Sequence, residues 1–77
     1  MYTPDEKMVK RIKNDFTYHA PKADSTQIDR YATIRDEAHE LAYCLLMATP
    51  PSREQSLALT HLEEVVFWAN AAIARNE

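Results

Sequence analysis

The side chains best suited to chemistry lie in the short segment from Phe16 to Lys22, where an aromatic ring, an imidazole and an ammonium group surround a proline. Aromatic faces stack on nucleobases and cations meet phosphates, so Tyr18, His19 and Lys22 together suit a nucleotide ligand. The structural alternative is that Phe16 belongs to the core, Tyr18 is a packing lid and Lys22 is solvated. On composition alone, the structural alternative is favoured.

Two arginines are further candidates for binding an anion. Arg35 falls at the polar edge of the apolar stripe of a predicted helix, where a lone arginine is most often an exposed salt-bridge partner. Arg75 lies near the end of the last predicted helix, where it could simply complement the negative end of the helix dipole. Neither arginine is diagnostic on its own.

No catalytic or metal-binding pattern is present in the sequence. His19, His39 and His61 fall on three different predicted elements and have neither a histidine four residues away nor a cysteine partner, so no metal site is expected. The acidic doublets Asp36-Glu37 and Glu63-Glu64 are expected to face solvent. Without glycine, neither a phosphate-cradling loop nor a dinucleotide fingerprint can be built. We therefore expect a protein that is not an enzyme and needs no cofactor.

Composition limits the partners and the location. The chain has 77 residues, enough for one domain over residues 1–77, and its net charge of -3 argues against binding a DNA or RNA polymer. A small anion can still be met by local cations, which are Lys7, Lys10, Arg11, Lys13 and Lys22. The longest apolar run, Leu41 to Ala48, is far shorter than the roughly 20 residues of a membrane-spanning helix, and no secretory segment opens the chain. We expect a cytoplasmic protein, with its only cysteine, Cys44, reduced and buried inside this run.

The spacing of apolar residues and prolines predicts an all-α fold with three helices, at about residues 4–15, 25–47 and 52–75. At the first helix, Thr3 is expected to be the cap and Pro4 the first helical residue. A helix of about three turns is marginal alone, so it must dock through its apolar residues. These residues recur at helical spacing and are Met8, Val9, Ile12 and Phe16.

The second and third helices are predicted to form an antiparallel hairpin, because the Thr49–Pro51 connection is short. Asp24 or Ser25 is expected to cap the second helix. Ser52, with Gln55 three residues later, has the spacing of a capping box for the third. The apolar stripe of the second helix comprises Ile28, Tyr31, Ile34, Ala38, Leu41, Ala42 and Leu45.

The third helix carries apolar residues on more than one face. The face predicted to pack on the second helix comprises Ala58 or Leu59, Leu62, Val65, Val66, Ala69, Ala72 and Ile73. Partly or wholly outside this face lie Leu57, Phe67, Trp68, Ala71 and Ala74. A hairpin this small buries only one face, and alanines let a neighbouring helix approach closely. We therefore expect the chain to assemble into a compact homo-oligomer.

Several strings, in a fixed order, resemble one protein family. They are Phe16-Thr-Tyr-His-Ala-Pro-Lys22, Arg30-Tyr31 with Ile34-Arg35, the turn over residues 50–60, and the ending Trp68-Ala-Asn-Ala-Ala-Ile-Ala-Arg75-Asn-Glu. The combination resembles the short helical-hairpin proteins of bacteriophages that act as anti-CBASS cyclic-oligonucleotide sponges. A related hairpin domain occurs in anti-Thoeris sponges. The resemblance covers about residues 16–77.

This resemblance implies a function without catalysis. Members of the family form hexamers of antiparallel hairpins and sequester cyclic dinucleotides, and in some cases cyclic trinucleotides, that bacterial immune synthases make as second messengers. Holding the messenger keeps the downstream effector switched off, which blocks CBASS anti-phage signalling. The resemblance therefore implies a phage protein that acts as a homohexamer in the cytoplasm of the infected host bacterium.

For a cyclic dinucleotide, the resemblance implies a site that includes the segment between the first two helices. Tyr18 would stack on a base, Arg35 would grip the phosphates, and His19 and Lys22 would lie nearby. The chain has Ala20-Pro21-Lys22-Ala23 where many relatives have Pro-Pro-Lys-Gly, so the turn is expected to differ in shape.

For a cyclic trinucleotide, the resemblance implies a site at the end of the third helix. Arg75 would face the phosphates where three protomers meet, with Trp68, Asn70 and Ala71 as neighbours. The chain lacks the extra N-terminal region of the longer anti-Thoeris members, which favours cyclic oligonucleotides as ligands. Two alternatives stay open: a sponge for the cyclic ADP-ribose-type signals of Thoeris, and a structural hairpin that binds a protein through Phe67 and Trp68.

Overall fold

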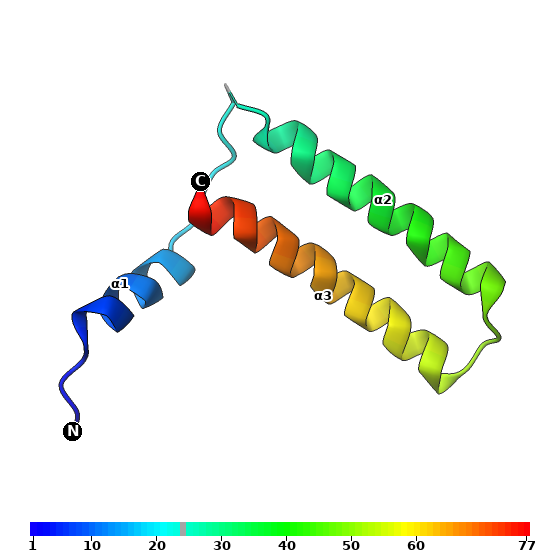
Figure 1. The fold of residues 1–77 in the computed structure, drawn as a ribbon, viewed down its shortest axis with the longest axis horizontal. Coiled ribbons are helices and arrows are strands. Elements are labelled where there is room, and N and C mark those ends of the chain that lie inside the picture. The colour runs from blue at the N-terminus through cyan, green and yellow to red at the C-terminus, as the bar shows by residue number, and fades with distance from the viewer. Residues whose placement is uncertain (24) are drawn as a thin grey trace.

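The computed structural model describes residues 1–23 and 25–77, which form three α-helices and, within these ranges, no β-strand (Figure 1). The helices are α1 (Glu6–Asp15), α2 (Gln27–Ala48) and α3 (Arg53–Asn76). α2 and α3 run antiparallel to each other, and α1 projects from the open end of this hairpin, beside the C-terminal end of α3. The predicted all-α fold with a helical hairpin is confirmed.

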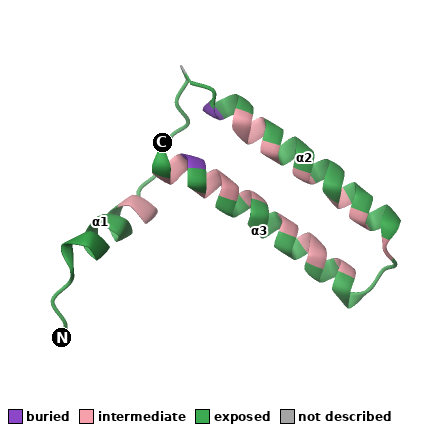
Figure 2. Ribbon diagram, viewed as in Figure 1, coloured by how far each residue is buried: buried purple, intermediate pink, exposed green. Residues whose placement is uncertain are grey.

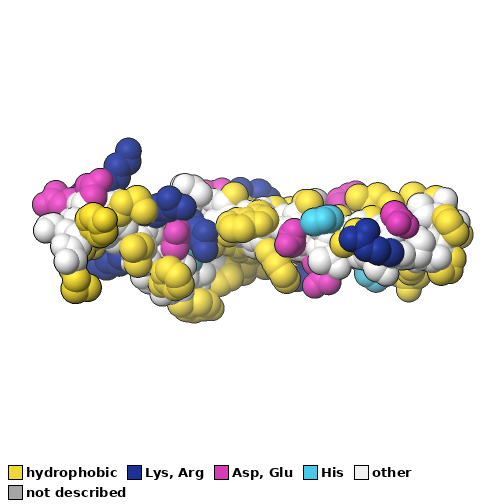
Figure 3. Space-filling view, turned by 90° about the horizontal axis from the view of Figure 1, so that it is seen from below, with side chains coloured by type: hydrophobic (Ala, Val, Ile, Leu, Met, Phe, Trp, Pro, Cys, Tyr) yellow, Lys and Arg dark blue, Asp and Glu magenta, His cyan; other side chains and the backbone are white. Residues whose placement is uncertain are grey.

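The molecule is a single layer of helices. It measures 51 × 40 × 13 Å, and its smallest dimension is close to the diameter of one helix with its side chains, about 10–12 Å. The faces of the helices above and below this layer therefore lie on the surface. Figure 3, which views the layer edge-on, shows hydrophobic side chains exposed along the length of the molecule between charged ones.

α1 begins later than the sequence predicts, at Glu6 instead of Pro4. Its N-cap is Asp5, whose carboxylate accepts a hydrogen bond from the backbone N–H of Lys7 at 3.1 Å. The prediction that Thr3 caps the helix is wrong. A carboxylate is a stronger cap than a threonine hydroxyl and also complements the positive end of the helix dipole, which explains the choice of Asp5.

α2 begins at Gln27 with Thr26 as its N-cap, slightly later than predicted. Of the two predicted caps, Asp24 lies outside the described residues. Ser25 is not the N-cap, although its Oγ accepts a hydrogen bond from the N–H of Gln27 at 3.2 Å. The same hydroxyl donates to the carbonyl oxygen of Lys22 at 2.9 Å, so it closes a turn before the helix starts.

The turn between α2 and α3 is held by one serine and one glutamine. Oγ of Ser52 accepts a hydrogen bond from the N–H of Gln55 at 3.1 Å, which confirms Ser52 as the N-cap of α3. The Gln55 side chain makes different bonds from those of a capping box, because its Nε2 donates to the carbonyl and hydroxyl oxygens of Thr49, both at 3.0 Å. These bonds tie the start of α3 to the end of α2 across the two prolines.

Two of the described residues are buried, and both lie at the open end of the hairpin (Figure 2). They are Ile73, which is 8% exposed, and Gln27, which is 4% exposed. The rest of the seam is half-buried and comprises Tyr31, Ile34, Ala38, Ala42 and Leu45 on α2 and Ala58, Leu59, Leu62, Val66 and Ala69 on α3. In the described residues, one chain therefore encloses no hydrophobic core.

The seam is narrower than the sequence predicts. The residues predicted to pack in it but exposed in the structure are Ile28 and Leu41 on α2 and Val65 and Ala72 on α3. The prediction that Cys44 is buried is also wrong for the single chain, where this residue is exposed. Two helices without further neighbours touch along one narrow strip of side chains. Apolar residues at the edges of this strip remain exposed to solvent.

α1 does not dock on its own hairpin through its apolar residues. All four, Met8, Val9, Ile12 and Phe16, are exposed, and Phe16 is 86% exposed although the structural alternative places it in the core. α1 meets α3 through its last turn instead, where Nδ2 of Asn14 donates to the carbonyl oxygen of Arg75 at 3.0 Å. The apolar side of α1 therefore has no cover in the single chain.

Glu77 closes the open end of the hairpin. Its carboxylate accepts hydrogen bonds from both Nη atoms of Arg30, one of them at 2.7 Å, and from Nε2 of Gln27 at 3.5 Å. Oε1 of Gln27 in turn accepts from the backbone N–H of Lys22 at 3.0 Å. The hydrogen bond from Arg30 holds the pKa of Glu77 at about 2, below its ordinary value of 4.5. This cluster joins the segment between α1 and α2 to the two helices of the hairpin.

Glu77→Gln is expected to lower the free energy of unfolding at neutral pH and to make it less dependent on pH in acid. Because this carboxyl has a lower pKa in the folded chain than in the unfolded chain, its contribution is complete above about pH 4.5 and is lost as the pH falls toward about 2. Urea unfolding followed by circular dichroism across this range measures both effects. The control is Glu63→Gln, at an exposed position of α3; equal losses in the two variants would show that the contact with Arg30 contributes nothing.

Candidate functional site

His19, in the segment between α1 and α2, folds back onto the end of α1. Its Nε2 lies 2.8 Å from the carbonyl oxygen of Asn14. Because a carbonyl oxygen only accepts, Nε2 carries a hydrogen and donates it to Asn14. This bond holds the loop against the helix, and Nε2 is not free to bind a phosphate.

Tyr18 and Lys22 lie in the same segment and present their side chains to solvent. Tyr18 is 84% exposed, so the idea that it is a packing lid is wrong for the single chain. The backbone that carries Lys22 is fixed, since its N–H donates to Oε1 of Gln27 and its carbonyl oxygen accepts from Oγ of Ser25. An exposed ring and an exposed ammonium on one short segment are accessible to a ligand.

Arg35 lies apart from the other three residues predicted for a dinucleotide. It is eight residues after Gln27, about 12 Å along α2. It lines a cavity of about 300 Å³ between α2 and α3, next to His39 and Glu63. Tyr18 and the rest of its segment do not line this cavity. One chain therefore does not bring the predicted dinucleotide residues together.

Three of the four residues predicted for a trinucleotide do come together. Trp68, Ala71 and Arg75 line a shallow cavity of about 290 Å³ on α3, with Glu64 and Phe67. Spacings of three and four residues place them on one side of the helix. Phe67 and Trp68 are 62% and 67% exposed, so the cavity offers aromatic faces beside a guanidinium. Such a set can stack on a base and bind a phosphate.

Asn70, the fourth residue predicted for the trinucleotide, does not line this cavity. Its Oδ1 is inaccessible to solvent and has no hydrogen-bond partner among the described residues. A buried acceptor is normally satisfied. The structure therefore does not place Asn70 with the other three residues predicted for a trinucleotide.

The last turn of α1 holds Arg75 in place. Nη1 of Arg75 lies 3.6 Å from Oδ1 of Asp15, and Oδ2 of Asp15 lies 3.7 Å from Nε of Arg11. Asn14 adds the hydrogen bond to the Arg75 carbonyl oxygen. The carboxylate orients the guanidinium and offsets part of its charge. Sequence reasoning missed Asn14 and Asp15, because the contact joins the two ends of the chain and no local pattern marks it.

Glu64 and Phe67 were also missed as residues of the cavity on α3. Glu64 precedes Trp68 by four residues and Ala71 by seven, so helical spacing was a usable signal. Glu64 also lies 3.1 Å from Nδ1 of His61, at the solvent-exposed side. Its charge is unfavourable to a phosphate, so the Arg75 end of the cavity is the end suited to an anion.

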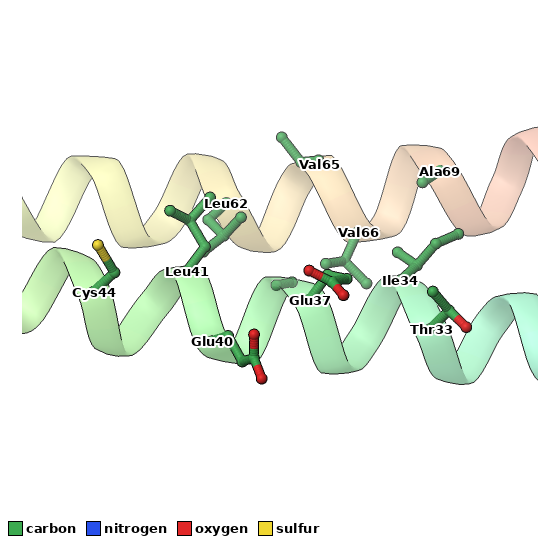
Figure 4. A pocket seen from close by; sticks show the side chains of 11 residues that line it. Thr33, Ile34, Glu37, Glu40, Leu41, Cys44, Leu62, Val65, Val66 and Ala69 are labelled. Atoms are coloured by element: carbon green, nitrogen blue, oxygen red, sulfur yellow. The ribbon is translucent and has the colours of Figure 1, made fainter.

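A larger cavity, of about 750 Å³, follows one side of the seam (Figure 4). We call it the α2–α3 groove; its α2 wall runs from Thr33 to Cys44 and its α3 wall from Leu62 to Ala69. Most lining side chains are apolar, and the charged ones are Glu37 and Glu40. Two carboxylates without a cation make the groove unsuited to a phosphate.

The described residues include no group of three or more histidine, cysteine, aspartate or glutamate side chains that could hold a metal ion. His39 packs edge-on against Tyr43, with ring centroids 5.1 Å apart. In the same part of the chain, none of the helices combines the length and the apolar character needed to cross a membrane. The basic and aromatic cavity on α3 and the exposed loop are therefore the surfaces with recognisable chemistry.

Comparison with known families identifies the hairpin. The family model described as "Acb2/Tad1, hairpin domain" matches residues 8–74, which include α2, most of α3, the first loop and most of α1. Neither the curated proteins nor the solved structures contain a match to the chain.

Proposed function

Since the chain belongs to the Acb2/Tad1 hairpin family of anti-CBASS and anti-Thoeris sponges, we propose that it sequesters cyclic di- and trinucleotide second messengers and so blocks CBASS anti-phage signalling. A sponge acts by stoichiometric binding, which requires affinity and no catalytic group. We place it in the cytoplasm of an infected bacterium, as a product of the phage. It competes there with the immune effector for the messenger.

The cavity on α3 is the observation that supports this proposal best. It combines the exposed rings of Phe67 and Trp68 with the Arg75 guanidinium, which suits a base and a phosphate. At about 290 Å³ it is at the lower limit of small-molecule sites, which span about 300–1,000 Å³. A cyclic trinucleotide therefore needs walls from further copies, and we propose that three copies each present Arg75 to it.

The dinucleotide site requires two copies for a different reason. Tyr18 does not line the cavity that Arg35 lines on the same chain, so we propose that Tyr18 of one copy stacks on a base while Arg35 of another binds the phosphates. Lys22 adds a cation near Tyr18. His19 acts mainly by holding the loop, through its bond to Asn14.

We expect native mass spectrometry to detect a homohexamer of about 53 kDa, from six copies of the 8.9 kDa chain. The physical reason is burial: among the described residues of one chain, Ile73 is the one buried hydrophobic residue, whereas many large apolar side chains are exposed, including Phe16, Phe67 and Trp68. Association removes this apolar surface from water. A monomer at micromolar concentration, by mass spectrometry and light scattering, would contradict the proposal.

Isothermal titration against a panel of cyclic di- and trinucleotides tests the function. We expect heat of binding with at least one member of the panel. Chromatography of the mixture afterwards should show that no member has been consumed. Mass spectrometry of small molecules released by denaturing the purified protein would identify a ligand retained from cells. Absence of binding to the whole panel, or turnover of a member, would defeat the proposal.

Exposure of Phe67 and Trp68 also favours a second function, a hairpin that binds another protein through these rings as hot-spot anchors. Pull-down from infected cells separates the two functions, since a stoichiometric protein partner supports the second and retained nucleotide supports the first. A cyclic ADP-ribose-type signal of Thoeris is the alternative ligand, and it belongs in the titration panel.

A further inference from the structure

α1 has an apolar side that its own chain leaves uncovered. This side, which we call the α1 stripe, consists of Met8, Val9, Ile12 and Phe16, all exposed. A helix of 10 residues is marginal in water without packing. The stripe therefore needs a surface to pack on if α1 is to persist.

The α2–α3 hairpin of the same chain does not provide this surface. Asn14 and Asp15 hold the last turn of α1 at the end of α3, through the backbone and side chain of Arg75. From that point α1 points away from the hairpin (Figure 1). With these contacts in place, the stripe does not reach the α2–α3 groove of the same chain.

The α2–α3 groove has the dimensions that α1 requires. Its α2 wall, from Thr33 to Cys44, covers 12 residues, about 18 Å of helix. α1 covers 10 residues, about 15 Å. The groove is open and mostly apolar, with Leu41 and Leu62 on opposite walls (Figure 4). One helix of this length fits along it.

The charges of the two surfaces are complementary. α1 carries four cationic and two acidic side chains, and Lys13 flanks the stripe by helical position. The charged side chains that line the groove are Glu37 and Glu40, both carboxylates. A basic amphipathic helix in an acid-rimmed apolar groove buries its stripe and keeps its cations beside the carboxylates.

We propose that α1 of one chain docks by its stripe in the α2–α3 groove of a second copy. The inference rests on the proposed self-association and names the contact that drives it. Each chain then gives one helix and receives one, as in a domain exchange. The arrangement also fixes the Arg75 cavity, because the α1 turn that holds Arg75 is anchored on a neighbouring chain.

Cross-linking through Cys44, which lies in the groove, tests this contact. Chains with Met8→Cys or Phe16→Cys, each combined with Cys44→Ala, are mixed with tagged wild-type chain under conditions that exchange subunits. A short bismaleimide then joins the new thiol to Cys44 of the wild-type chain. Stripe residues at both ends are used because α1 can lie in either direction. The matched control is Lys10→Cys, on the opposite side of α1.

We expect a mixed-mass product from one stripe variant, at several times the yield given by the Lys10 control. Equal yields from stripe and control variants would overturn the inference. A product of two wild-type chains joined at Cys44, without any mixed product, would also overturn the inference, because the grooves of two chains would then face each other. Native mass spectrometry of the same samples distinguishes failure of the proposed self-association from failure of α1 docking. A monomer would contradict self-association, whereas an intact oligomer without the mixed product would contradict only the docking of α1.

Discussion

Arg75→Ala is expected to weaken binding of a cyclic trinucleotide by about ten- to a hundredfold, measured by isothermal titration. The guanidinium lies in the cavity with Phe67 and Trp68, where a phosphate would replace solvent around it. Loss of a hydrogen bond to a charged group costs about 1.5–3 kcal/mol, which gives this range. Because three copies are proposed to meet at one ligand, the measured loss should lie near the upper end.

The matched control is Arg53→Ala, which removes an exposed arginine at the other end of α3. A second control separates phosphate binding from the contact with α1. Asp15→Asn breaks the same ion pair as Arg75→Ala but keeps the guanidinium. If the Asp15 variant loses as much affinity as the Arg75 variant, the effect comes from the position of α1, and Arg75 is not the phosphate ligand.

Local patterns predicted the number and order of helices well, because these depend on neighbouring residues. The two prolines end α2, and Ser52 caps α3 through a bond to a residue three positions later. The caps of α1 and α2 were predicted wrongly because competition between neighbouring polar residues decides them. Several polar side chains compete for the free N–H groups there, and the choice of Asp5 over Thr3 follows from a ranking of caps that spacing does not contain.

Burial was harder to predict, since apolar spacing shows which residues prefer to be covered and not what covers them. Leu41 and Val65 have the spacing of seam residues, yet both are exposed on the single chain and line the α2–α3 groove. Gln27 shows the reverse. A polar residue is buried because its amide bridges Lys22 and Glu77, which are far apart in the sequence.

In the candidate site too, sequence spacing reveals residues that share one helix but not contacts between distant parts of the chain. Trp68, Ala71 and Arg75 lie on one helix, so their spacing suffices to place them on one side of α3. The residue that orients Arg75 is Asp15, at the opposite end of the chain, and no local pattern reveals it. Tyr18 and Arg35 belong to different elements, and only the position of a second copy would decide whether they share a ligand.

Tyr18→Ala is expected to weaken binding of a cyclic dinucleotide by about five- to a hundredfold, because stacking on an aromatic ring contributes about 1–3 kcal/mol per base. The ring is 84% exposed, so its removal should leave the free energy of unfolding of the chain nearly unchanged. Arg35→Ala should weaken the same ligand by about tenfold or more, through loss of a charged hydrogen bond. Titration of both variants and native mass spectrometry of their oligomers measure the effects.

The control for the ring is Tyr2→Ala, at another fully exposed tyrosine, and the control for the charge is again Arg53→Ala. The two effects should not add, since both groups hold one ligand from different copies and removal of either leaves it loosely bound. The double variant should therefore lose less affinity than the product of the two single losses. Independent effects would place Tyr18 and Arg35 at separate sites, and unchanged binding in both single variants would remove the dinucleotide assignment while leaving the site at Arg75 untouched.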